Sequence, residues 1–444
     1  MLAFVFPGQG AQFPGMGKAL ADTSAIARET FESADAALGF GLGELCFHGD
    51  PDRLSRTEYA QPAILAVSVA AYRVLVAETG CHPLVVAGHS LGEITAHVCA
   101  GALDFDSALR LVRRRGALMQ EAVGAGAGAM VAVMGLAAEV VDGLCDAAAQ
   151  SEVVAVANYN GAGQLVISGH RAAVGRVRSL AEERGAITRE LDVSAPFHCP
   201  LMEPAAARFR AALAEVDVAQ PRIPVVDGTS GVWRRAGADT VGSLAAQICA
   251  PVRWDAVMAG LSAHGVRYAI EVGPGARLTS MLRRAEKSIR TAHFGDPEDL
   301  ATVAELLGES PWLRRELGQW HVGDGGDLYA PGAAEIVWAG ANDPEPVTAD
   351  AWTALPDGSR MHRYGALAMI TPDDRLHTFD PVAWRAREDG AYLRADHTGV
   401  VHPAGRRETF DPGEWTVDAA GTMRRTDGSR VVWSDGDEWS FTAG

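Results

Sequence analysis

Long apolar runs and a basic leader are missing from this sequence. No stretch of about 18 consecutive apolar residues occurs, so a membrane-spanning helix is not expected. The start, MLAFVFPGQG, has no basic residue ahead of its short apolar segment, which argues against a secretory signal peptide. The net charge of −17 argues against nucleic acid as a partner. These features predict a cytoplasmic protein that binds neither membrane nor nucleic acid.

Paired cysteines and lysines are also scarce. The six cysteines form no CxxC pair, which argues against a zinc site or a disulfide framework and fits a reducing compartment. Only two of the 39 basic residues are lysines, a bias that we attribute to genome composition. What is present is typical of a globular protein, with 48 % hydrophobic and 21 % charged residues, and the 444-residue length predicts two or three domains.

Residues 1–300 alternate short apolar runs with Ala-, Leu- and Arg-rich segments that are typical of helices. Four runs end in a turn and are predicted to be buried strands: FVFPG (4–8), LVVAG (84–88), IPVVDG (223–228) and YAIEVG (268–273). This alternation predicts an α/β domain with a largely parallel sheet. We assign its core to residues 1–125 and 195–305.

A different pattern interrupts this domain at residues 126–194. Strands are predicted at 129–136, 153–159, 164–169 and 187–193, and helices at 137–150 and 170–186. The resulting order, βαββαβ, is typical of a ferredoxin-like unit. We therefore expect a ferredoxin-like insert in the α/β domain.

The composition changes again near residue 310, beyond which eight of the ten tryptophans lie. Trp320, Trp352, Trp384 and Trp415 are 32, 32 and 31 residues apart, and each is followed six residues later by a glycine. After a linker at 306–319, this period predicts four mainly-β repeats over 320–444, each with a Trp, a turn, a strand, a second turn and a second strand. Closure like a propeller and stacking like a solenoid are both open. We expect a docking module, with a structural cap as the alternative.

The clearest chemical motif is GHSLGE (88–93), which lies between an apolar run and the small-residue segment EITAHVCAGAL. In a strand–turn–helix setting, a Gly-x-Ser-x-Gly motif places the serine at a helix N-terminus, where backbone N–H groups can stabilise an oxyanion. Ser90 is therefore the predicted nucleophile, with Gly88 and Gly92 permitting the strained turn. One departure is that Glu93 follows the second glycine at once.

A serine nucleophile needs a base at neutral pH. Among thirteen histidines, His198 in SAPFHC is the best candidate because it follows a strand and a proline where the insert returns to the main domain. His89 and His97 flank the serine motif and are expected to support the turn.

Six motifs in this order resemble the malonyl-CoA:acyl carrier protein transacylases, the acyltransferases of fatty acid and polyketide synthases. They are FPGQGAQ (6–12), GHSLGE (88–93), RRGALMQ (114–120), SAPFHCPLM (194–202), QICAPVRW (247–254) and EVGPG (271–275). The resemblance covers about residues 1–300 and implies a hydrolase-like α/β fold with a ferredoxin-like insert. It also implies that His198 pairs with Ser90, that the backbone carbonyl of Gln247 orients the imidazole, and that the amides of Gln9 and Leu91 bind the oxyanion.

The resemblance gives a further role to one of three consecutive arginines. The family pattern Arg-Gly-x-x-Met-Gln selects Arg115, which would hold the free carboxylate of a malonyl or methylmalonyl group; Arg113 and Arg114 fit a solvated helix face. A guanidinium binds a carboxylate in a two-pronged geometry that lysine cannot copy. Leu91 and Phe197 resemble the malonyl-selective form. Ala195 departs from it, since modular polyketide domains often carry another His there.

The implied reaction moves a malonyl group from malonyl-CoA, through an acyl-serine, to the phosphopantetheine thiol of an acyl carrier protein. No bound cofactor or metal is expected. A basic patch of Arg283, Arg284, Lys287 and Arg290 is a candidate contact for the carrier, with an ordinary solvated helix as the alternative. We expect action in trans, with a synthase partner as a candidate ligand of the repeats. The alternatives are a hydrolase that clears carrier-bound acyl chains, specificity for methylmalonyl or another dicarboxylic acyl group, and a non-catalytic scaffold. Pathway, carrier and oligomeric state stay open.

Overall fold

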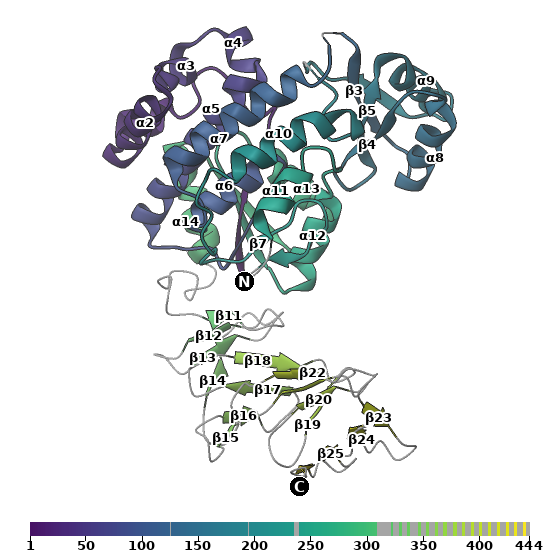
Figure 1. Cartoon of the computed structure of the whole chain (residues 1–444). Helices are drawn as coiled ribbons and strands as arrows, with labels where there is room; N and C mark the ends of the chain where they lie inside the picture. The colour runs from purple at the N-terminus through teal and green to yellow at the C-terminus, as the bar shows by residue number, and fades with distance from the viewer. Residues whose placement is uncertain are drawn as a thin grey trace. The chain divides into compact units, whose positions relative to one another are not determined.

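The chain divides into two compact units, Met1–Arg315 and Glu316–Gly444 (Figure 1). The computed structural model describes residues 1–308 apart from 125, 194 and 235–238, and beyond residue 308 mainly short strand segments between 321 and 440.

A six-stranded sheet forms the centre of the first unit, in the order β10-β9-β1-β2-β7-β8. Its strands are Leu2–Phe6 (β1), Val85–Gly88 (β2), Val225–Val226 (β7), Trp233–Arg234 (β8), Tyr268–Val272 (β9) and Arg290–Phe294 (β10). Neighbouring strands are parallel except for β7 and β8, so the expected largely parallel sheet is confirmed. The edge strands β8 and β10 were not predicted, because edge strands are less buried and their apolar pattern is weak.

Helices surround this sheet. They are α1 (Lys18–Thr23), α2 (Ala25–Leu38), α3 (Leu42–His48), α4 (Pro51–Ser55), α5 (Thr57–Thr79), α6 (Leu91–Cys99), α7 (Phe105–Glu121), α10 (Glu203–Leu213), α11 (Thr240–Ala246), α12 (Trp254–Ala263), α13 (Arg277–Ala285) and α14 (Leu300–Gly308), with short 3₁₀ turns at Pro200–Met202 and Pro297–Asp299. The last helix includes the first residues of the expected 306–319 linker, and residues 309–319 lie outside the described part of the chain.

Helix α5 is the longest helix that the structure describes, and most of its residues are buried. By length and composition it could cross a membrane, alone among the helices that the structure describes, although no such segment was expected from the sequence. Of its most apolar stretch, 78 % is buried inside the protein. Its apolar composition is therefore explained by packing against the sheet and helices of its own unit.

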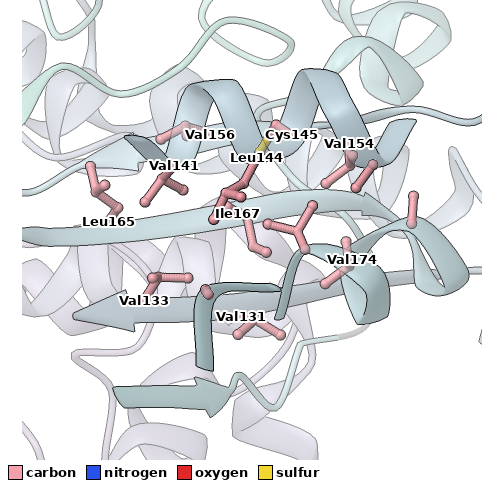
Figure 2. Close-up of a cluster of buried hydrophobic side chains, with 14 of the residues drawn as sticks. Val131, Val133, Val141, Leu144, Cys145, Val154, Val156, Leu165, Ile167 and Val174 are labelled. Carbon is pink, nitrogen blue, oxygen red and sulfur yellow. The ribbon is translucent and has the colours of Figure 1, made fainter. Parts of the chain in front are cut away.

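Residues 128–190 form a second, antiparallel sheet in the order β4-β5-β3-β6. Its elements are β3 (Gly128–Met134), α8 (Ala138–Ala149), β4 (Val154–Tyr159), β5 (Gln164–His170), α9 (Arg171–Glu182) and β6 (Ile187–Glu190), in the chain order that was expected. One face of the sheet, which carries Val131, Val133 and Ile167, packs against α8 and α9 (Figure 2). Because side chains alternate along a strand, Met130, Ala132 and Met134 point to the other face.

The second unit contributes four four-stranded antiparallel sheets, β11–β14, β15–β18, β19–β22 and β23–β26. The first two sheets consist of His321–Val322, Leu328–Ala330, Glu335–Val337 and Glu345–Pro346, and of Trp352–Ala354, Arg360–His362, Leu367–Ile370 and Leu376–Phe379. The other two consist of Trp384–Ala386, Tyr392–Arg394, Gly399–Val401 and Arg407–Thr409, and of Trp415–Val417, Met423–Arg425, Arg430–Val432 and Glu438–Ser440.

Three of these sheets begin at the marker residues Trp352, Trp384 and Trp415. Each has four strands, so the expectation of two strands per repeat was wrong. The strands have two to four residues, too few to give an alternating pattern that can be recognised in the sequence. Trp320 and the four marker glycines lie outside the described residues.

The turn from β2 into α6 brings three backbone segments unusually close together. A Cβ atom on Gly88 would lie 1.9 Å from the carbonyl carbon of Gly92, and one on Gly92 would lie 2.1 Å from the carbonyl oxygen of Phe6 at the end of β1. Between them Ser90 has φ 53° and ψ −106°, a conformation that non-glycine residues rarely adopt. Both motif glycines are thus required by packing.

Replacement of Gly92 by alanine should therefore destabilise the first unit by about 2 kcal/mol or more, because backbone atoms must move to admit the methyl group. The matched control is Gly143→Ala in α8, where an added Cβ meets nothing within 4 Å. That change should stabilise the protein by about 0.5–1 kcal/mol, because alanine favours helix more than glycine does. Urea unfolding of the three proteins checks both; an unchanged Gly92→Ala stability would contradict the packing requirement.

Candidate active site

The parallel strands β1, β2, β7 and β9 all end at one edge of the central sheet, where open α/β sheets usually bind ligands. A cavity of about 840 Å³ lies there, lined both by loops of the α/β core and by the free face of the second sheet. The predicted residues that line it are Gln9, Ser90, Arg115, Phe197 and His198. The fold therefore brings together residues that are up to 189 positions apart in the chain.

Ser90 and His198 are in direct contact. Ser90 Oγ lies 2.8 Å from His198 Nε2. On the other side of the ring, Nδ1 lies 2.9 Å from the carbonyl oxygen of Gln247 and 3.2 Å from that of Ala250. Carbonyls only accept hydrogen bonds, so Nδ1 carries the proton and Nε2 offers its lone pair to the serine hydroxyl. This tautomer is the one that a general base needs.

The surroundings of His198 keep its imidazole neutral. Burial lowers its pKa to about 3, and the positive charge of Arg115 acts in the same direction. At neutral pH the ring is therefore unprotonated and able to take the serine proton. Its own backbone has a φ of 58°, so both partners of the pair lie at strained positions.

Arg115 reaches the same point from α7. Its Nη2 donates to Ser90 Oγ at 3.2 Å and to Gln247 Oε1 at 2.9 Å, and its Nη1 donates to Gln61 Oε1 at 3.0 Å. Only 1 % of the residue is exposed. Burial lowers its pKa to about 10, with Glu93 acting in the opposite direction, so the guanidinium stays charged at neutral pH.

The hydrogen bonds of Arg115 are incomplete. Its buried Nε–H has no acceptor in the described part of the chain, and the hydrogen bonds found there for its other nitrogens go to uncharged groups, not to a carboxylate. A buried cation without a carboxylate is costly. Such a group is suited to receive an anionic ligand at the cavity floor.

The neighbouring arginines lie elsewhere, as the helical spacing predicts. Arg113 packs over the ring of Phe40 at 4.9 Å, and Arg114 forms an exposed ion pair with Glu215 at 3.2 Å. Of the three, only Arg115 lines the cavity.

The two predicted oxyanion donors lie on either side of the serine turn. Leu91 is the first residue of α6, so its amide has no partner within the helix. Gln9 lies in the turn after β1, and its amide has no backbone acceptor among the described residues. Gly8 packs this turn onto the serine loop, since a Cβ there would lie 2.3 Å from the carbonyl oxygen of His89. Neither amide has a backbone partner among the described residues, and Gln9 lines the same cavity as Ser90.

The cavity wall differs in one respect from the expectation. Phe197 lines the cavity, but the fully buried side chain of Leu91 is absent from the described lining residues. The side chain of Leu91 therefore does not form part of the described cavity wall. Three methionines that were not predicted, Met119, Met130 and Met134, supply much of the apolar wall.

Of the histidines on either side of the serine, His97 is buried, whereas His89 is partly exposed and lines the cavity. His89 Nε2 lies 3.1 Å from Oδ1 of Asn160, the residue after β4, and the His89 ring lies 5.8 Å from that of Trp254. Burial lowers the pKa of His89, and it lowers that of His97 to about 4. The bond to Asn160 joins the serine loop to the inserted residues across the cavity.

Sequence reasoning missed three contributors: Gln61, the carboxyl group of Glu93 and the side chain of Gln247. Gln61 lies within the apolar helix α5, and a polar residue in a buried apolar run is itself a signal, because it must find a partner. Glu93 was noted only as a departure from the motif. The partners of all three lie far away in the sequence, so their contacts could not be inferred.

A buried serine in contact with a neutral histidine, beside free amides and an arginine, defines an enzyme of the serine-dependent acyl-transfer class. Residues 3–319 match the family model described as acyl transferase domain. The malonyl CoA-acyl carrier protein transacylase of Escherichia coli (strain K12) is 41 % identical over 305 residues, which cover 68 % of this chain and 99 % of that protein. The chain therefore belongs to the malonyl CoA-acyl carrier protein transacylases of the acyl transferase family.

Solved structures give the same result. An acyl carrier protein S-malonyltransferase from Vibrio cholerae matches with a TM-score of 0.66 and 43 % identity, covering 68 % of this chain and 99 % of that one. A malonyl-transacylase in complex with a type II polyketide synthase acyl carrier protein matches with a TM-score of 0.67 and 40 % identity, over 68 % and 99 % of the two chains. The C-terminal unit thus lies largely outside the segment shared with these proteins.

The lowered pKa of His198 predicts an unusual pH dependence. The base form is present above the pKa and is lost only as the pH falls through about 3, rather than near 6.5. We therefore expect the rate at which a neutral sulfonyl fluoride modifies Ser90 to show no inflection between about pH 5 and pH 7. Intact mass at timed intervals measures this rate, with Ser90→Ala as the unreactive control. A sigmoidal fall centred near pH 6.5 would show that the imidazole is not held neutral.

Proposed function

We propose that the chain transfers a malonyl group from malonyl-CoA to the phosphopantetheine thiol of an acyl carrier protein. The observation that carries this proposal is the buried, charged Arg115, whose Nη2 lies 3.2 Å from Ser90 Oγ. A cation beside the nucleophile suits an acyl group that ends in a carboxylate. The names of the relatives, malonyl CoA-acyl carrier protein transacylase and acyl carrier protein S-malonyltransferase, support the same donor and acceptor.

In the first half-reaction Ser90 Oγ attacks the thioester carbonyl carbon while His198 Nε2 takes the hydroxyl proton. The carbonyl oxygen becomes an oxyanion that the amides of Gln9 and Leu91 stabilise; one such donor is typically worth about 3 kcal/mol. The C–S bond then breaks, and the proton on His198 passes to the departing sulfur. The products are free CoA and malonyl-Ser90.

In the second half-reaction the carrier's thiol replaces CoA in the cavity. His198 takes the thiol proton, the sulfur attacks the ester carbonyl, and the bond to Ser90 Oγ breaks as the proton returns to it. A shared acyl-serine intermediate requires ping-pong kinetics. No bound cofactor or metal ion takes part in this scheme.

Arg115 would hold the malonyl carboxylate throughout both steps. Its unpaired Nε–H supplies a donor for one carboxylate oxygen, and rearrangement of Nη2 away from Ser90 Oγ would supply another. Phe197 on the wall leaves little room for an α-methyl branch, which favours malonyl over methylmalonyl. A hydrolase of uncharged acyl chains would have no use for this buried cation.

Exposed arginines at the cavity rim suit anionic parts of both substrates. Arg189, Arg277 and Arg284 line the cavity and are exposed. Of the basic patch considered from the sequence, only Arg284 lies there; Arg283 is held by Thr291, to whose Oγ1 it donates at 2.9 Å. We propose that the rim arginines attract the CoA phosphates and an acidic carrier protein.

The remaining assignments rest on the sequence pattern. We propose residues 1–125 and 195–305 as the catalytic core, 126–194 as a ferredoxin-like insert, and 320–444 as a four-repeat docking module for a synthase partner. Cytoplasmic location and action in trans, in polyketide or fatty acid synthesis, belong to the same proposal.

Incubation with malonyl-CoA should leave a malonyl adduct on the intact protein, because the ester on Ser90 is protected from water until a thiol enters. Intact mass spectrometry detects the adduct, which should be absent from Ser90→Ala. Addition of a carrier protein bearing phosphopantetheine should move the label to the carrier. Rapid release of free malonate without delivery to any carrier would instead support the hydrolase alternative.

Substitution of Arg115 by alanine should lower kcat/KM for malonyl-CoA by about 100-fold or more, because a charge-assisted contact of about 3 kcal/mol is lost. The same variant should lose its preference for malonyl over acetyl. Arg114→Ala is the matched control, since its side chain forms an exposed ion pair with Glu215, and it should behave like wild type. An unchanged malonyl-to-acetyl ratio in Arg115→Ala would exclude the carboxylate contact.

A further inference from the structure

We propose that Glu93 is a positioning residue for acyl transfer, which fixes the side-chain amide of Gln247 in the one orientation that serves Ser90, His198 and Arg115 together. This proposal rests on the proposed function, in which Ser90 and His198 react and Arg115 binds the acyl group. Glu93 does not contact His198 directly; it would act on the site through Gln247.

Gln247 contacts all three groups at once. Its backbone oxygen accepts from His198 Nδ1 at 2.9 Å, and its side-chain Oε1 accepts from Arg115 Nη2 at 2.9 Å. Its Nε2 donates to the backbone oxygen of Ser90 at 3.1 Å and, through a short hydrogen bond, to Glu93 Oε2. The residue is 1 % exposed, so water cannot replace any of these partners.

These contacts permit only one amide orientation. If the side-chain amide were reversed, its NH₂ group would face the donors of Arg115, and its oxygen would face the acceptors on Ser90 and Glu93. Glu93 Oε2 also accepts from the Gly228 amide at 3.1 Å, so its position is fixed from the far side. An acceptor oxygen on Glu93 therefore selects the orientation in which Gln247 Oε1 meets Arg115.

A shift of Gln247 would change the positions of both His198 and Arg115. The same residue supplies the backbone carbonyl that fixes the histidine tautomer and the amide oxygen that fixes the guanidinium. Loss of the Glu93 acceptor should thus slow proton transfer at Ser90 and weaken selection of malonyl together. A residue that only supported the fold would have no reason to change the two in parallel.

The acceptor oxygen, rather than the negative charge, is the property that matters. Glu93 is 2 % exposed, and burial raises its pKa to about 8, with the nearby Asp227 adding to the effect. The Glu93 carboxyl group is therefore mainly protonated at neutral pH, and its C=O oxygen still accepts hydrogen bonds. Glutamine at this position keeps such an oxygen, whereas methionine of similar length does not.

The test compares Glu93→Gln with Glu93→Met, and uses Glu271→Met as the matched control. Glu271 is another buried acid, 1 % exposed, that accepts from a backbone amide, that of Thr279 at 2.7 Å, and it is absent from the described cavity lining. Three quantities are measured for each protein: the rate of Ser90 sulfonylation by phenylmethanesulfonyl fluoride, the malonyl-to-acetyl ratio of acyl-enzyme formation, and the melting temperature.

We expect Glu93→Met to lower the sulfonylation rate and the kcat of malonyl transfer roughly tenfold to a hundredfold, the effect of one lost buried hydrogen bond, with a smaller change in KM. Its malonyl-to-acetyl ratio should fall as well. Glu93→Gln should retain both within about threefold. Glu271→Met should lower the melting temperature but leave the rates unchanged.

The proposal would be overturned if folded Glu93→Met kept the wild-type sulfonylation rate, kcat and malonyl-to-acetyl ratio. It would also be overturned if Glu93→Gln or Glu271→Met lost as much of these quantities as Glu93→Met does. If Glu93→Met does not fold, Glu93→Asp takes its place, because its shorter side chain withdraws the oxygen from Gln247; wild-type behaviour there would overturn the proposal too. Sulfonylation needs neither malonyl nor a carrier. A wild-type protein that takes no malonyl would therefore refute the proposed function while the rate comparison still tests Glu93.

Discussion

The close approach of the serine turn to the end of β1 is the constraint on which the site depends. Gly92 lies so near the carbonyl oxygen of Phe6 that no side chain fits between them, and Gly8 meets His89 in the same way. These backbone contacts hold the Gln9 turn against the start of α6. Ser90 takes its strained conformation within this close packing, at the start of α6.

Burial of polar groups gives this arrangement its chemical properties. A solvated histidine, arginine and glutamate would keep ordinary pKa values, whereas here burial lowers those of His198 and Arg115 and raises that of Glu93. The neutral imidazole and the cation support each other, because the charge of Arg115 helps to keep His198 unprotonated, and Gln247 accepts a hydrogen bond from each of them. Burial of such polar groups is unfavourable in free energy. The burial of apolar side chains around α5, most of whose residues are buried, offsets this.

The sequence predicted the parts of the site that are encoded by local backbone requirements. Ser90 was predicted as a nucleophile from the glycines of its motif, whereas the pairing of His198 with Ser90 and the choice of Arg115 came from the family resemblance. Gln61, Glu93 and the side chain of Gln247 were missed because their partners lie 54 to 157 residues away. Distant partners also explain why the edge strands β8 and β10 were not predicted, since their pairing depends on the whole sheet. The four strands of each C-terminal sheet were missed for another reason: they are too short to show an alternating pattern.

A crystal structure of the enzyme trapped as malonyl-Ser90 tests most directly whether one cavity floor both activates the serine and selects the acyl group. The account predicts that the malonyl carboxylate lies within hydrogen-bond distance of the Arg115 guanidinium, including its Nε–H, with the ester carbonyl between the amides of Gln9 and Leu91. A carboxylate that points into solvent, with Arg115 still donating to Ser90 Oγ, would contradict it.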